Sequence, residues 1–235
     1  MGTSKGYIPP TDQKWKNAKR AVGNIGKKGY SHSSIQGALK KYADAYSSTH
    51  LRNSNVTNVI GGLLGFITDI QKSGFEVTLQ QYGLSHFKDL KGLDLYKGLL
   101  DYFAKDVNTP DGQIIRDGLG DTFDKLGINE FDDLAKLDVT EFLLTFLTEF
   151  IVKGFEECFA EKIIEKMDDL NKYDDIIREA EKIVEDRVFV DQSIKDILSI
   201  DLKSAEGKDY TTKIINNTYE SLKAMEVIAN EDMDK

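Results

Sequence analysis

The fold of this chain is decided by residues 138–159, DVTEFLLTFLTEFIVKGFEECF. Apolar side chains recur there every three or four residues, and Phe142, Phe146 and Phe150 lie about one helical turn apart. Asp138 can accept hydrogen bonds from the first free amides of a helix, and Glu141 follows three residues later, as in a capping box. The stretch therefore predicts a long helix over residues 139–168 with a wide apolar face.

The same spacing recurs on both sides of this helix. Near the N-terminus, the first apolar face consists of Trp15, Ala18, Val22 and Ile25. Further helices are predicted at about 12–25, from Ser33 or Ser34 onward, and at 55–69, 78–82, 93–105, 112–125, 173–189 and 208–229. The one short strand candidate is Val188–Val190. The sequence therefore predicts an all-α fold, a multi-helix bundle with a flexible N-terminal tail.

Gly61 and Gly65 form a pair of small residues four positions apart within an apolar stretch. In a lipid bilayer such a pair favours close association of two membrane-spanning helices. The apolar run here is shorter than the roughly 20 residues that a spanning helix needs. We therefore expect Gly61 and Gly65 to allow close helix packing inside a soluble core.

Charge is unevenly distributed along the 235 residues, although the whole chain carries a net charge of −9. Residues 1–60 hold ten Lys and Arg against two Asp, a net charge of +8, and the remainder carries −17. The basic candidate contact patch comprises Lys14, Lys16, Lys19, Arg20, Lys27 and Lys28. It either reaches an anionic partner or forms the solvated faces of ordinary helices. The predicted division is a tail over 1–12, a basic helical arm over 13–52 and an acidic all-α domain over 53–235.

Residue patterns for catalysis or metal binding are weak. The three histidines, His32, His50 and His86, lack the close spacing of a zinc site, and Cys158 lies on an apolar helix face. The segment 23–28 lacks the spacing of a phosphate-binding loop, and 106–112 lacks that of a calcium loop. A single cysteine excludes an internal disulfide and is typical of a reducing compartment. We therefore expect a cytoplasmic, non-enzymatic protein without metal, cofactor or membrane segment.

The first residues, Met1-Gly2-Thr3-Ser4, are a local feature of interest. The small Gly2 permits removal of Met1, which leaves an unhindered α-amine with a pKa near about 7.7–8. Gly6 occupies the position where N-myristoylation favours Ser or Thr, so a lipid is not expected. These residues are otherwise the ordinary beginning of a tail.

Several stretches resemble the QatB family of the bacterial Qat anti-phage defence system. The resemblance extends over roughly residues 1–160. It is carried by Met1–Ser4 with the Gly/Pro tail, Gly61–Leu64, Leu79–Leu84, Leu90–Gly92, Leu99–Asp101 and the turn Pro110–Gly112. The resemblance implies partners: an ATPase, a QueC-like (QatC-type) enzyme and a TatD-like nuclease.

The resemblance also implies a role for the tail. QueC-type enzymes use ATP to activate a carboxylated deazaguanine, which ammonia then attacks. If the amine of Gly2 replaced ammonia, an amide would join the base to this protein, with Thr3 and Ser4 recognised by the enzyme. Two alternatives stay open: an unmodified protein that bridges the ATPase and the nuclease, and a nucleic-acid-binding module that uses the basic arm.

Overall fold

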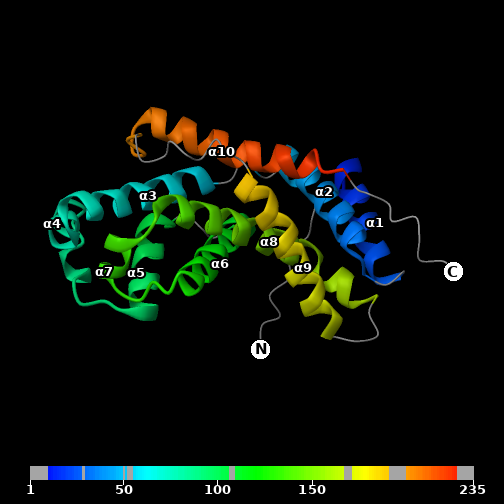
Figure 1. The fold of residues 1–235 in the computed structure, drawn as a ribbon, viewed down its shortest axis with the longest axis horizontal. Helices are drawn as coiled ribbons and strands as arrows, with labels where there is room; N and C mark the ends of the chain where they lie inside the picture. The colour runs from blue at the N-terminus through cyan, green and yellow to red at the C-terminus, as the bar shows by residue number, and fades with distance from the viewer. Residues whose placement is uncertain are drawn as a thin grey trace. The chain divides into compact units, whose positions relative to one another are not determined.

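The computed structural model describes residues 10–27, 30–49, 51, 55–105, 109–166, 171–190 and 200–226. Over these residues it contains ten α-helices and one short 3-10 helix, and no strand (Figure 1). The helices are α1 (Gln13–Lys27), α2 (His32–Thr49), α3 (Val56–Ser73), α4 (Phe75–Gln81), η1 (Ser85–Phe87), α5 (Gly92–Phe103), α6 (Pro110–Lys125), α7 (Phe131–Lys136), α8 (Val139–Ile164), α9 (Asn171–Val190) and α10 (Ala205–Lys223). The predicted all-α class is confirmed.

The chain forms two compact units, each assembled from separated pieces of sequence. Unit 1 comprises residues 1–53, 151–190 and 216–235, and unit 2 comprises residues 54–150 and 191–215. The division passes through α8 and α10. The predicted boundary near residue 52 lies close to the first junction between the units, and the separate role of the basic arm stays a prediction.

Unit 1 is built around aromatic side chains. The helices α1 and α2 pack side by side, and α9 packs against α2 (Figure 1). The Trp15 ring lies 6.1 Å from that of Phe159, and Tyr46 stacks on Tyr219 at 5.7 Å. All four predicted face residues of α1, from Trp15 to Ile25, are fully buried. The three-to-four spacing thus identified the core side of this helix correctly.

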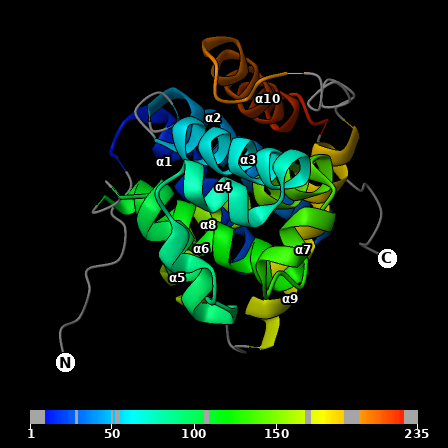
Figure 2. The same ribbon diagram turned by 90° about the vertical axis from the view of Figure 1, so that its left-hand side faces the viewer.

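Unit 2 has a second core, in which α3 packs against α4, α5 and α7 (Figure 2). Phe66 of α3 lies 5.5 Å from Phe103 of α5, and Phe123 of α6 lies 6.1 Å from Phe142 of α8. A side chain at Gly118 of α6 would come within 3.1 Å of the Phe150 backbone. The glycine therefore allows α6 to approach α8 closely.

The helix predicted from residues 138–159 is present as α8. Asp138 Oδ1 accepts hydrogen bonds from the amides of Thr140 at 2.8 Å and Glu141 at 3.1 Å, so it caps the helix as predicted. The described helix ends at Ile164, four residues before the predicted end, and residues 167–170 lie outside the described part.

The strand candidate Val188–Val190 was wrong, because these residues form the end of α9. Ile176, Ala180, Val184 and Val188 follow one another at intervals of four and are all buried. Their helical period outweighs the strand preference of three adjacent residues. The short helix α7 was missed, since six residues are too few to show a period.

Candidate functional site

The predicted basic patch lies partly on α1. Lys14 Nζ forms an ion pair with Asp44 Oδ1 of α2 at 2.7 Å, which neutralises one of its charges. Lys16 and Arg20 are exposed one helical turn apart, and Lys19 is half-buried. Lys28 and the side chain of Lys27 lie outside the described residues. The structure therefore brings Lys16 and Arg20 together on one side of α1.

The start of α1 is firmly anchored. Asp12 Oδ1 accepts hydrogen bonds from the amides of Lys14 at 2.8 Å and Trp15 at 3.1 Å. The Trp15 indole is buried and its Nε1 donates to Thr49 Oγ1 of α2 at 3.1 Å. The predicted modification and recognition residues, Gly2, Thr3 and Ser4, precede this anchor and lie outside the described residues.

The histidines and the cysteine do not converge. His32 Nδ1 lies 2.7 Å from Glu179 Oε1 of α9, the His86 ring contacts the adjacent Phe87 ring, and Cys158 is buried. His50 lies outside the described residues. Among the residues that are described, no group of three or more His, Cys, Asp or Glu side chains could hold a metal ion.

Carboxylates in the acidic part of the chain take part in local pairs. Glu149 is buried and lies 2.5 Å from Lys125 Nζ, and Glu156 accepts a hydrogen bond from the Tyr173 hydroxyl at 2.8 Å. Burial, followed by this hydrogen bond, raises the pKa of Tyr173 far above its ordinary value, so the phenol stays protonated and donates. These pairs support structure and do not form an acid–base couple around a cavity.

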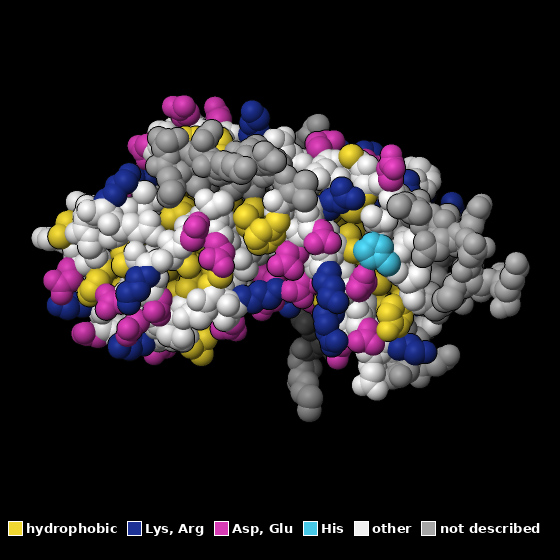
Figure 3. Space-filling view, in the orientation of Figure 1, with side chains coloured by type: hydrophobic (Ala, Val, Ile, Leu, Met, Phe, Trp, Pro, Cys, Tyr) yellow, Lys and Arg dark blue, Asp and Glu magenta, His cyan; other side chains and the backbone are white. Residues whose placement is uncertain are grey.

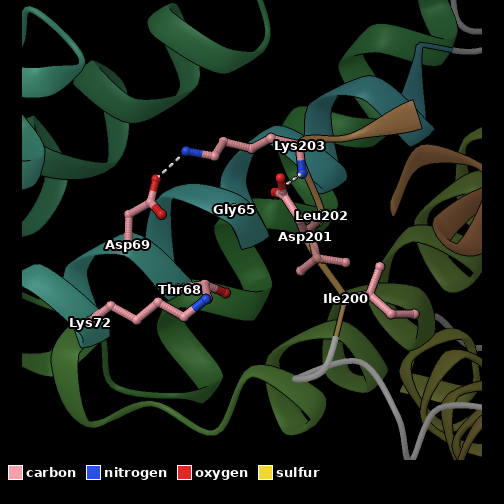
Figure 4. Close-up of a pocket in the computed structure, with 8 residues that line it drawn as sticks. All are labelled: Gly65, Thr68, Asp69, Lys72, Ile200, Asp201, Leu202 and Lys203. Carbon is pink, nitrogen blue, oxygen red and sulfur yellow. Dashed lines mark hydrogen bonds and ion pairs between the residues drawn. The ribbon is translucent and has the colours of Figure 1, made fainter. Parts of the chain in front are cut away.

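A polar pocket of about 410 Å³ opens in unit 2, beside the C-terminal half of α3 (Figure 4). Its lining consists of Gly65, Thr68, Asp69, Lys72, Ile200, Asp201, Leu202 and Lys203. We call it the α3 pocket. The Lys203 ammonium reaches over to α3 and lies 2.5 Å from Asp69 Oδ2.

The Asp69 carboxylate is the centre of the polar contacts beside the α3 pocket. The same Oδ2 accepts a hydrogen bond from the Tyr82 hydroxyl at 2.9 Å, and Lys203 Nζ lies 5.4 Å from the centre of the Tyr82 ring. Burial, followed by the hydrogen bond to Asp69, raises the pKa of Tyr82 well above its ordinary value. Tyr82 therefore donates to Asp69 throughout the neutral range.

The chemistry of the α3 pocket favours binding over catalysis. Two lysines balance two aspartates, and the Thr68 hydroxyl donates to the Leu64 carbonyl at 2.8 Å. Asp201 Oδ1 accepts from the Lys203 amide at 3.1 Å, so this carboxylate shapes the local turn. Sequence reasoning missed this pocket, although the pair Gly61 and Gly65 marked the face of α3 beside it.

The surface charges and the helix lengths bear on the alternative functions. On the face drawn in Figure 3, dark-blue Lys and Arg side chains lie interspersed with magenta Asp and Glu side chains. None of the described helices combines the length and the apolar character needed to cross a membrane.

The comparison with protein families gives a match over most of the chain. A family model described as "Qat anti-phage system associated protein QatB" matches residues 47–222, about three quarters of the sequence. The chain belongs to the QatB family. No curated protein and no solved structure matches it. As a QatB-family protein it is associated with the Qat anti-phage system, which implies other components of that system as partners.

The range that matches the QatB family differs from the range of the resemblance. It extends to residue 222, well beyond residue 160, and therefore includes the α3 pocket and nearly all of α10. It begins at residue 47, so α1, the basic patch and Gly2–Ser4 lie outside it. The family match thus rests on the helical body and not on the tail.

Proposed function

We propose that this QatB-family protein is a non-catalytic acceptor whose N-terminal Gly2 is conjugated to a deazaguanine-type base by a QueC-like partner enzyme. The observation that carries the proposal is the anchored start of α1. Asp12 caps the helix, and Trp15 fixes it in the core of unit 1. The residues ahead of this anchor are therefore joined to a secured body and can serve as a substrate arm.

The length of the arm suits delivery of an amine into a partner's active site. The ten residue steps from Gly2 to Asp12 span at most about 33–36 Å when fully extended. Ordering each residue costs about 1–2 kcal/mol of backbone entropy. Specific contacts to Thr3 and Ser4 would have to offset that cost, which is why we assign recognition to them.

The chemistry requires only an accessible amine. The Gly2 nitrogen attacks the activated carboxyl carbon of the base, a C–N bond forms, the activating group leaves, and the nitrogen loses one proton. An α-amine with a pKa near about 7.7–8 is partly unprotonated at neutral pH, whereas a lysine with a pKa near about 10.4 is almost fully protonated. The α-amine of Gly2 is therefore favoured over the neighbouring Lys5.

Co-expression with the QueC-like enzyme tests the proposal by intact mass and by the mass of the N-terminal peptide. The protein should lose Met1 and gain the mass of the base at Gly2. Gly2→Pro should block the gain, because the proline ring turns the primary amine into a hindered secondary one. Thr3→Val and Ser4→Ala should reduce it. Lys5→Arg is the matched control and should leave it unchanged.

An unmodified mass in every condition would overturn the acceptor proposal. If Gly2→Pro also preserved protection against phage, the unmodified bridging role would replace it. Loss of the added mass in Lys5→Arg alone would move the attachment point from the α-amine to the lysine.

A nucleic-acid-binding role receives less support. Lys14 is already paired with Asp44, and acidic side chains are interspersed with basic ones on the face shown in Figure 3. A net charge of −9 adds general repulsion from a polyanion. We therefore place this role second to the acceptor role.

A further inference from the structure

Residues 200–204, which we call the strap, lie against α3 within unit 2 (Figure 4). Leu202 is buried, and its carbonyl oxygen lies 3.7 Å from the place where a side chain at Gly61 would begin. At Gly65 the first side-chain atom would come within 2.6 Å of Lys203 Cγ. The Gly61–Gly65 face of α3 therefore leaves the space that the strap occupies.

The strap is tied to the beginning of α10. The Ser204 hydroxyl donates to the Asp201 carbonyl at 2.6 Å and accepts from the Gly207 amide at 3.1 Å. The Lys208 amide donates to the Ser204 carbonyl at 3.1 Å. A side chain at Gly207 would collide with the backbone of Asp201 and Leu202. Movement of the strap must therefore disturb the first turn of α10.

Few strong contacts hold the strap in place. Leu202 is its one fully buried side chain, and Ile200 and Ser204 are half-buried. The ion pair between Lys203 and Asp69 is partly open to water, with 47% and 21% of the two side chains exposed. Such pairs contribute little, and salt screens them. Segments with few buried contacts open locally well before the whole protein unfolds.

We propose that the strap is a releasable closure over the Gly61–Gly65 face of α3, fastened by the ion pair between Lys203 and Asp69. When the ion pair breaks, residues 200–204 lift together with the first turn of α10. Lifting uncovers the glycine face and widens the α3 pocket. The inference goes beyond the proposed function and does not depend on it, because it concerns unit 2 alone.

Hydrogen exchange of the full-length protein, read by mass spectrometry, tests the closure. Lys203→Met keeps the aliphatic chain over Gly65 and removes the ammonium. The amides of Gly207 and Lys208 should then exchange about two- to five-fold faster, the effect of losing a weak, partly exposed ion pair. Lys72→Met is the matched control, because Lys72 lines the same pocket and forms no ion pair with a described residue.

Asp69→Asn and a rise in salt provide independent readouts. Asp69→Asn removes the charge but keeps an acceptor for Tyr82, so it should speed exchange as Lys203→Met does. The double variant should be no faster than either single variant, because both break one pair. Raising the salt concentration should speed exchange in the wild type and leave Lys203→Met unchanged.

Two results would overturn the inference. One is an unchanged exchange rate at Gly207 and Lys208 in Lys203→Met. The other is an equal rise across α8 and the other core helices, since that would mean a global loss of stability and not release of the strap.

Discussion

Replacing Trp15 by Ala tests whether the anchor of α1 has the strength that its environment implies. The indole is 0% exposed, lies 6.4 Å from the Tyr42 ring and 6.1 Å from the Phe159 ring, and donates to Thr49. Truncating a large buried aromatic to Ala costs about 3–5 kcal/mol, because apolar contact is lost and a cavity remains. For a chain of this length, that corresponds to a fall of about 6–20 °C in the melting temperature.

The parts of this cost can be separated. Thr49→Val removes the acceptor for the indole N–H and should cost about 0.5–1.5 kcal/mol for that hydrogen bond, with a further loss from the bond that Thr49 donates to Ala45. Trp15 is the sole tryptophan, so its fluorescence reports on the environment in the Thr49 variant. Lys16→Ala, at the neighbouring exposed position, is the control and should stay within about 0.5 kcal/mol of the wild type.

Urea and thermal unfolding, followed by circular dichroism at a helical wavelength, provide the measurement. A change below about 0.5 kcal/mol in Trp15→Ala, the size typical of exposed positions, would refute the assignment of Trp15 to the core. The same result would remove the anchor on which the acceptor proposal depends. A large loss of stability in Lys16→Ala would instead show that helix α1 is sensitive for reasons other than its buried face.

Three further outcomes are expected. Burial raises the pKa of Tyr96 to about 12, so the folded form holds its proton more tightly; unfolding free energy should fall as pH rises from about 10, and Tyr96→Phe should flatten that fall in urea titrations. Duplex DNA should bind the purified protein weakly, and alanine at four positions of the basic patch should not change the salt slope; a loss of about 0.9 per phosphate contact would restore the nucleic-acid role. The variant carries Lys14→Ala, Lys16→Ala, Lys19→Ala and Arg20→Ala. The protein alone should show no nuclease or ATPase activity, and a metal-dependent activity abolished by one carboxylate substitution would contradict its non-catalytic assignment.

The local features of the sequence were sufficient to predict the helices. Helical period is a property of neighbouring residues, so the faces around Trp15 and Phe146 could be read without knowing what they contact. The cap at Asp138 is equally local, since it depends on one side chain and two nearby amides. The resemblance to the QatB family also came from short stretches, and the family match confirms it over the helical body.

The tertiary structure alone decided which faces meet. The sequence pattern predicted that Gly61 and Gly65 allow close packing, but not that the strap from residue 200 onward would fill the space. Nor could periodicity show that residues 151–190 join residues 1–53 in one unit, or that Lys203 would meet Asp69 across 134 positions. An apolar face specifies only that something must cover it. Which segment does so depends on the whole set of competing packings, and that information is distributed along the entire chain.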